Sequence, residues 1–204
     1  MKLYNIKPYK RKARWTKRRD LKKAPAPYQN LIKGTCPIIP GTVLVGDFTH
    51  MIYFSKVVYL ATYMDLVTRE IVGWFVAARH TKEMVIEAIV DAIKTLGSLP
   101  RIIHTDQGSE YTSKEYTKFL NSLGIQISMS AKSSPWENGF QESFYSQFKV
   151  DLGYISRFEK VEELIEGIYQ TIYYYNNQRI HTSIKMAPVS FRYIYEERLL
   201  RQTV

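Results

Sequence analysis

Three carboxylates are spaced so that separate elements of one fold would present them together. Asp47 and Asp106 each end an apolar run, and Glu142 lies within a stretch that has the composition of a helix. Oxygen ligands from separate elements suit a hard divalent cation and leave coordination positions for water and phosphate. Two such ions close together activate a nucleophile and stabilise the leaving oxygen in phosphodiester chemistry. These residue types therefore indicate a metal-dependent reaction on a phosphodiester.

Each carboxylate also has a purely structural interpretation. Asp47 would be a residue at a strand end, Asp106 would begin the turn formed by Gln107, Gly108 and Ser109, and Glu142 would be a solvated helix residue. Three carboxylates held together without a cation repel one another and raise one another's pKa, which makes a purely structural cluster unfavourable. Taken singly, each residue leaves both interpretations open.

The stretch from Ser134 to Gly153 contains the signals of the helix that would carry Glu142. Ser134 is a good N-cap, and Pro135 suits the first helical position. Glu137 completes a Ser-x-x-Glu capping box, in which each side chain accepts a hydrogen bond from the backbone at the other end. The capping box uses Glu137, so Glu142 is the candidate for chemistry.

Two further polar residues would share a helix face with Glu142. Asn138, Glu142 and Lys149 follow an i, i+4, i+11 spacing, which places them on one stripe of a helix. Lys149 would contact a DNA phosphate near the site, and Asn138 would orient water or DNA. The alternative for both is an ordinary solvated position on the helix.

Hydrophobic periodicity predicts the elements that must position these residues. Apolar and β-branched runs predict strands over 42–50, 56–64, 71–77, 101–105 and 125–129, and 3.6-residue periodicity predicts helices over 81–96, 113–123 and 161–177. The first three strands would form an antiparallel meander, and the last two would add in parallel through right-handed crossovers. We therefore expect an α/β fold, a mixed five-stranded sheet with helices on both faces, in which Asp47 and Asp106 lie side by side.

Composition sets broad limits on the protein. The chain has 204 residues, of which 45% are hydrophobic, which is enough for one globular domain with a core. The sequence contains no apolar run of about 18 residues, so no membrane span is expected. Cys36 is the only cysteine and there are four histidines, which excludes an intrachain disulfide and a zinc finger. These features favour a cytoplasmic protein.

The net charge is concentrated at the N-terminus. Residues 1–23 contain eleven Lys or Arg and one acidic residue, so they carry the whole net charge of +10. Tyr4, Tyr9 and Trp15 interleave these charges and would stack on bases. The alternative is a solvated tail that maintains solubility. We divide the chain into a basic arm with a Pro/Gly linker, 1–41, and a catalytic body with a C-terminal helical extension, 42–204. The DNA-binding candidates in the arm are Lys10, Arg11, Lys12, Arg14, Lys17, Arg18 and Arg19.

An ordered set of motifs resembles one known family over nearly the whole chain. The carboxylates Asp47, Asp106 and Glu142 resemble the DDE signature of integrase-core transposases, members of the ribonuclease H-like superfamily that also includes retroviral integrases. The resemblance is closest to the OrfB transposases of the third large family of bacterial insertion sequences. Leu44 departs from the family's common Trp, and Ser133 with Ser134 replaces a common Gly. The matching segments are 46–52, 65–74, 104–111, 137–144 with Lys149, 175–181 and 188–191.

The resemblance implies a ribonuclease H-like fold and metal-dependent DNA strand cleavage and strand transfer, the chemistry of transposition and DNA integration. It implies two Mg²⁺ or Mn²⁺ ions, with Asp47 bridging both and Asp106 and Glu142 each completing one. It further implies DNA partners (element ends and target), a homodimer or higher assembly on DNA, no membrane association, and action at the bacterial nucleoid.

Family members usually carry helix-turn-helix segments upstream that recognise the element ends, and this sequence shows none. We therefore expect a fragment, a truncated copy, or one part of a system in which a separate protein or segment recognises the ends. Two alternatives remain open. One is a decayed or domesticated protein that only binds DNA, and the other is a ribonuclease H-like nuclease without strand transfer.

Overall fold

A twisted five-stranded sheet forms the centre of the molecule in the computed structural model, which describes residues 26–131 and 139–202. The strand order is β3-β2-β1-β4-β5. The strands are β1 (Val43–Tyr53), β2 (Lys56–Asp65), β3 (Ile71–Ala77), β4 (Ile102–Thr105) and β5 (Gln126–Met129). The first three pair antiparallel, while β4 pairs parallel with both β1 and β5. This arrangement confirms the predicted meander with two added parallel strands.

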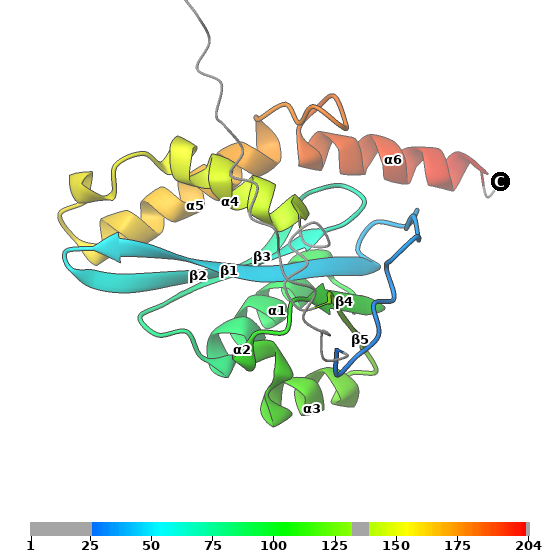
Figure 1. Cartoon of the computed structure of the whole chain (residues 1–204). Helices are drawn as coiled ribbons and strands as arrows, with labels where there is room; N and C mark the ends of the chain where they lie inside the picture. Colours follow the sequence, from blue (N-terminus) through cyan, green and yellow to red (C-terminus); the bar gives the residue numbers. More distant parts are fainter. Residues whose placement is uncertain (1–25, 132–138, 203–204) are drawn as a thin grey trace, which may run out of the picture.

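Helices cover both faces of the sheet (Figure 1). On one face lie α1 (Lys82–Leu96), α2 (Ser109–Thr112) and α3 (Lys114–Ser122); on the other lie α4 (Gly139–Leu152), α5 (Val161–Asn177) and α6 (Pro188–Gln202), with a 3₁₀ turn, η3 (Ile155–Arg157), before α5. None of the helices in the described part of the chain is long and apolar enough to cross a membrane.

Sequence signals account for the position of α1. Thr81 caps the helix by accepting a hydrogen bond from the Met84 backbone, and Gly97 ends it in the left-handed conformation with φ of 66°. The helix packs so closely on β3 that a Cβ at Gly73 would lie 2.3 Å from the Ala88 carbonyl oxygen. Only glycine permits this close approach.

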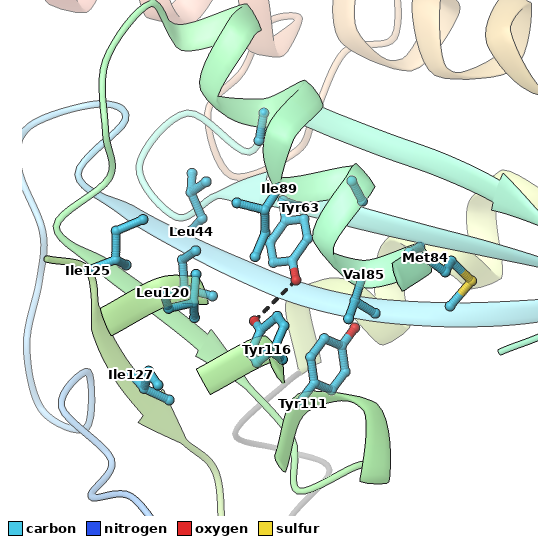
Figure 2. Packing of buried hydrophobic residues seen from close by; sticks show 14 of the residues in the cluster. Leu44, Tyr63, Met84, Val85, Ile89, Tyr111, Tyr116, Leu120, Ile125 and Ile127 are labelled. Carbon is cyan, nitrogen blue, oxygen red and sulfur yellow. Dashed lines mark hydrogen bonds between the residues drawn. The ribbon is translucent and has the colours of Figure 1, made fainter. Parts of the chain in front are cut away.

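The core between the sheet and α1–α3 is rich in tyrosine (Figure 2). Tyr63 from β2 and Tyr116 from α3 are both fully buried, and their hydroxyls lie 3.2 Å apart at hydrogen-bond distance. Burying a phenol hydroxyl without a hydrogen-bond partner costs free energy. Because the two hydroxyls are partners for each other, both large rings can fill the core. Aliphatic residues surround them, including Leu44, Val85, Ile89, Leu120, Ile125 and Ile127.

A second apolar cluster joins the opposite sheet face to α4 and α5, through residues such as Leu60, Phe144, Phe148 and Ile168. Asn176 fixes α5 to the edge strand: its side chain accepts from the Ile71 N–H and donates to the Ile71 carbonyl, each at 2.9 Å. The amide of Asn176 thus replaces a missing neighbouring strand at the edge of the sheet.

Three features were not predicted. The segment expected as a turn at Ser109 begins the short helix α2, and neither η3 nor the terminal helix α6 was identified. Helix α6 is held by a salt bridge between Arg192 and Glu70 in the β2–β3 turn, 2.7 Å long. The predicted capping box of Ser134 and Glu137 lies outside the described residues.

The segment between 26 and 41 has no helix or strand but contacts the body of the protein. The Leu31 N–H donates to the Ser128 hydroxyl at 2.8 Å, and Tyr28 packs against the core beside β5. Asp65, the last residue of β2, is buried and accepts hydrogen bonds from the N–H groups of Gly41, Val67 and Thr68. The division of the chain at residue 41 stays a prediction.

Candidate catalytic site

Asp47 and Asp106 lie at the same level of two adjacent parallel strands. The β1–β4 pairing aligns Val45 with His104, so the same register places Asp47 beside Asp106 two residues further on. Asp106 directly follows the last residue of β4, where the ladder between these strands has ended. The predicted juxtaposition of the two aspartates is therefore a consequence of the sheet topology.

The carboxylate of Asp47 is poorly solvated. Burial is the largest cause that raises its pKa, to about 7, and the negative charges of Asp106 and Glu142 raise it further. One opposing contact is the Phe48 N–H, which donates to Asp47 Oδ1 at 2.8 Å and lowers the pKa. Because both other carboxylates act on Asp47, all three candidate residues share one electrostatic environment.

Asp106 has a second carboxylate beside it, that of Glu110. Although Asp106 is exposed as a residue, removal of water from its carboxylate raises its pKa, and the charge of Glu110 adds to the effect. The Gly108 N–H donates to Asp106 Oδ1 at 2.9 Å and opposes both. A Cβ at Gly108 would sit 3.1 Å from Asp106 Oδ1 and 3.2 Å from Glu110 Oε2, so a larger residue would crowd both carboxylates.

Glu142 lies in the first turn of α4 and is exposed. The residue before it, Gln141, is fully buried, and its Nε2 donates to the Val45 carbonyl at 2.5 Å. The Tyr145 hydroxyl, one turn later, donates to the Asp47 carbonyl at 2.7 Å. The chain therefore fixes the helix to β1 on both sides of Glu142.

Thr62 of β2 completes this set of contacts, which we call the α4 anchor (Thr62, Gln141 and Tyr145). Thr62 is the Cα partner of Asp47 in the β1–β2 ladder. Its hydroxyl donates to Gln141 Oε1 at 3.1 Å and lies 2.8 Å from the Tyr145 hydroxyl. Thr62 and Gln141 are fully buried. Water therefore has little access to replace either side chain as the hydrogen-bond partner of the other. The anchor sets the position of Glu142 relative to Asp47.

The carboxylates do not form a closed metal cage. Within 26–131 and 139–202, no group of three or more His, Cys, Asp or Glu side chains lies close enough together to hold a metal ion. What the structure shows instead is three carboxylates at one end of the β1–β4 pair, near enough for their charges to interact.

The remaining predicted DNA contacts are only partly within the described chain. Lys149 is exposed on α4, seven residues after Glu142, and its contact with DNA stays a prediction. Asn138 and the arm residues Lys10, Arg11, Lys12, Arg14, Lys17, Arg18 and Arg19 lie outside the described residues.

Sequence reasoning missed the residues that surround the three carboxylates. Gln141 and Tyr145 lie on the same buried face of α4 as Phe148 and Leu152, so a glutamine among apolar positions was the available signal. Glu110 is also buried, beside Asp106, but it directly follows the segment interpreted as a turn and was assigned to no element. Its role depends on a tertiary contact that no local pattern indicates.

The strand order, the parallel β1–β4 pair and the helices on both faces define a ribonuclease H-like fold. Family models described as "Integrase core domain" match residues 38–135 and 123–188. The transposase for insertion sequence element IS904 of Lactococcus lactis is 34% identical over 183 residues, which span 89% of this chain and 69% of the relative. The chain belongs to the integrase core family and is the catalytic core of an insertion-sequence transposase.

Other relatives agree with this assignment. An uncharacterized transposase-like protein of Haemophilus influenzae is 35% identical over 75% of this chain and 71% of its own length. The putative transposase InsK for insertion sequence element IS150 of Escherichia coli is 29% identical, and this chain spans 55% of its length.

Solved structures support the fold. The HTLV-2 integrase catalytic core domain in complex with magnesium matches with a TM-score of 0.62 and 20% identity, over 76% of this chain and 98% of that one. A chain of the simian T-cell lymphotropic virus intasome in complex with the PP2A regulatory subunit B56 gamma matches with a TM-score of 0.66 and 18% identity, over 84% of this chain and 59% of that one.

Proposed function

We propose that this core carries out divalent-metal-dependent cleavage of a DNA strand and its transfer to a target, with Asp47, Asp106 and Glu142 as the metal-binding residues. The observation that supports this most directly is the register of the parallel β1–β4 pair, which puts Asp47 level with Asp106. Burial raises the pKa of Asp47, and the charges of Asp106 and Glu142 raise it further. Three carboxylates repel one another in the absence of metal, and a bound cation removes this repulsion and so stabilises the folded protein.

The donor set suits Mg²⁺ or Mn²⁺. It consists of carboxylate oxygens alone, which are the ligands that hard divalent cations prefer. Bound ions would activate the attacking oxygen and stabilise the leaving oxygen at a phosphodiester, and we propose two of them. Asp47 would contribute to both, with Asp106 and Glu142 each completing one.

The chain's own residues have separate tasks in this proposal. The Phe48 N–H donates to one oxygen of Asp47, and the Gly108 N–H donates to one oxygen of Asp106. These hydrogen bonds fix the orientation of the two carboxylates. The α4 anchor joins the helix that carries Glu142 to β1 at Val45 and Asp47. Preorganised charges of this kind stabilise a transition state without reorganising during the reaction.

We further propose that the partners are DNA, both element ends and target, and a second copy or more of this chain assembled on it, in the bacterial cytoplasm at the nucleoid. The basic arm with Lys10, Arg11, Lys12, Arg14, Lys17, Arg18 and Arg19 supports DNA binding, because it carries the whole net charge. A separate protein or segment would recognise the element ends.

The test is an assay that measures nicking and joining separately, using labelled duplexes that end in the terminal sequence of the element, with Mn²⁺. We expect both reactions from the wild-type chain and neither from Asp106→Asn. Nicking without joining would leave a ribonuclease H-like nuclease, and DNA binding without either reaction would indicate a protein that only binds DNA.

A further inference from the structure

A hollow of about 550 Å³ opens between the start of β2, in the β1–β2 hairpin, and the segment that joins β3 to α1. We call it the hairpin hollow, and its lining residues are Lys56, Val57, Tyr59, Ala78, Arg79, His80 and Thr81. This lining includes two cationic side chains, both exposed, two aromatic rings and, among the described residues, no carboxylate. Cations interleaved with aromatic rings are the combination that binds a nucleic acid strand.

The aromatic side chains of the hollow contact one another and a buried carboxylate. His80 Nδ1 lies 2.5 Å from Glu110 Oε1; the Glu110 side chain is only 6% exposed, whereas that of His80 is 53% exposed. The His80 ring lies nearly parallel to Phe48, at an angle of 8° and 6.2 Å between centroids, and Tyr59 lies 5.0 Å from His80. A stacking surface that is already ordered loses little side-chain freedom on binding.

The hollow is connected to the candidate catalytic site by one chain of side-chain contacts and by one neighbour in the sequence. Phe48, which stacks with His80, is the residue after Asp47. Glu110, which holds His80, is the residue whose charge acts on Asp106. A strand whose phosphodiester lies at Asp106 therefore has a cationic and aromatic surface on the side of Glu110.

We propose that the hairpin hollow binds one unpaired nucleotide of the DNA strand that enters the site, an inference that rests on the proposed function. The base stacks on Tyr59 and His80, and Arg79 and Lys56 contact the phosphates on either side of it. The hollow has room for a base and its sugar, and its charge is opposite to that of the backbone. The pairing of His80 with Glu110 orients the ring.

The experiment uses the full chain and a single-stranded oligodeoxynucleotide that contains 5-iodouracil, which crosslinks to stacked aromatic side chains on irradiation. Mass spectrometry then identifies the crosslinked residue. We expect crosslinks at Tyr59 or His80 in the wild type and in Tyr59→Phe, which keeps the ring. Crosslinks confined to other regions, including the basic arm, would overturn the proposal.

A second measurement uses charge reversals at exposed residues, which change the affinity for the oligonucleotide without altering the protein core. Arg79→Glu should weaken binding of the same oligonucleotide by about tenfold and reduce the slope of log affinity against log salt by about 0.7 for each phosphate that the variant no longer neutralises. The matched control is Lys118→Glu, a charge reversal at an exposed residue of α3, for which we expect a change of less than about twofold. Equal effects of the two substitutions would contradict a specific role for the hollow.

The outcome is separable from the proposed function. The variant Asp106→Asn should keep the wild-type crosslink although it no longer cleaves DNA. A wild-type chain that cleaves DNA but crosslinks elsewhere disproves only the nucleotide subsite, whereas a chain that crosslinks in the hollow but never cleaves disproves only the catalytic proposal.

Discussion

The hydroxyl of Tyr145 donates a 2.7 Å hydrogen bond to the carbonyl oxygen of Asp47. This bond joins the helix that carries one candidate metal ligand to the strand that carries another, across 98 positions of sequence. Gln141 makes a parallel connection to Val45, and Glu142 lies between the two contacts along the helix. The geometry of the site therefore depends on buried hydrogen bonds as well as on the carboxylates.

Removing these bonds should impair catalysis more than stability. Tyr145→Phe loses the bond to Asp47 and should lower the free energy of unfolding by ~1–2 kcal/mol, the usual scale for a buried hydrogen bond. It should lower the cleavage rate at least about tenfold, because small displacements of a catalytic group cost about that much or more. Denaturation midpoints and single-turnover rates measure the two effects.

A matched control for the α4 anchor is Gln147→Leu. Gln147 lies on the same helix, half-buried, and donates to Asp151 at 2.9 Å, away from the carboxylates. Gln141→Leu should behave like Tyr145→Phe, while Gln147→Leu should cleave at close to the wild-type rate. If all three variants lost activity equally, the anchor would have no special role in positioning Glu142.

The pH dependence of stability should reveal Asp47 directly. Its pKa is about 7 in the folded protein and 3.8 in the unfolded chain, so the folded state binds this proton more tightly. The resulting stabilisation is complete at low pH and is lost as pH rises from about 4 to about 7. We expect the metal-free wild type to lose stability over this interval and Asp47→Asn to lose less; urea midpoints across the interval provide the measurement. An identical pH dependence in both proteins would rule out the raised pKa.

The two glutamates near the start of α4 should differ in function. Glu142 is exposed, so Glu142→Gln should abolish strand cleavage with little change in stability. Glu137 is predicted to cap the helix, so Glu137→Gln should retain activity, and Glu137→Ala should cost about 1 kcal/mol of stability while remaining active. Cleavage rates and denaturation midpoints of the three variants distinguish the roles. An inactive Glu137→Gln beside an active Glu142→Gln would reassign the third carboxylate.

The basic arm should supply most of the non-specific DNA affinity. Residues 1–23 carry the whole net charge of +10, and each phosphate they neutralise contributes about −0.9 to the slope of log affinity against log salt for duplex DNA. Deleting the arm should weaken binding and flatten this slope without changing the melting temperature. Unchanged affinity and slope would identify the arm as a solubility tail.

Much of this fold could be predicted because its local signals agree with its topology. Thr81 and Gly97 mark the ends of α1 correctly, and apolar and β-branched runs identify all five strands. The sheet register then follows from one parallel pairing, which is why Asp47 and Asp106 could be placed side by side from the sequence alone.

The features that were missed depend on contacts distant in sequence. Helix α6 has a weak apolar periodicity and is fixed by Arg192 on Glu70, a pair 122 residues apart. In the sequence, Gln141 is an ordinary polar residue of a helix, and only the folded structure shows that it donates to the Val45 carbonyl. Likewise, the connection from His80 through Glu110 to Asp106 joins three segments that no periodicity relates.

The central claim is that Asp47, Asp106 and Glu142 together bind a divalent cation. The most direct test is a Mn²⁺ titration followed by electron paramagnetic resonance, in which free and bound Mn²⁺ give distinct signals, using the wild type, Asp47→Asn, Asp106→Asn and Glu142→Gln. We predict that the wild type binds Mn²⁺ and that each substitution weakens the affinity by at least about tenfold, since each removes one charged ligand. Mn²⁺ binding of equal affinity in all four proteins would contradict the shared metal site.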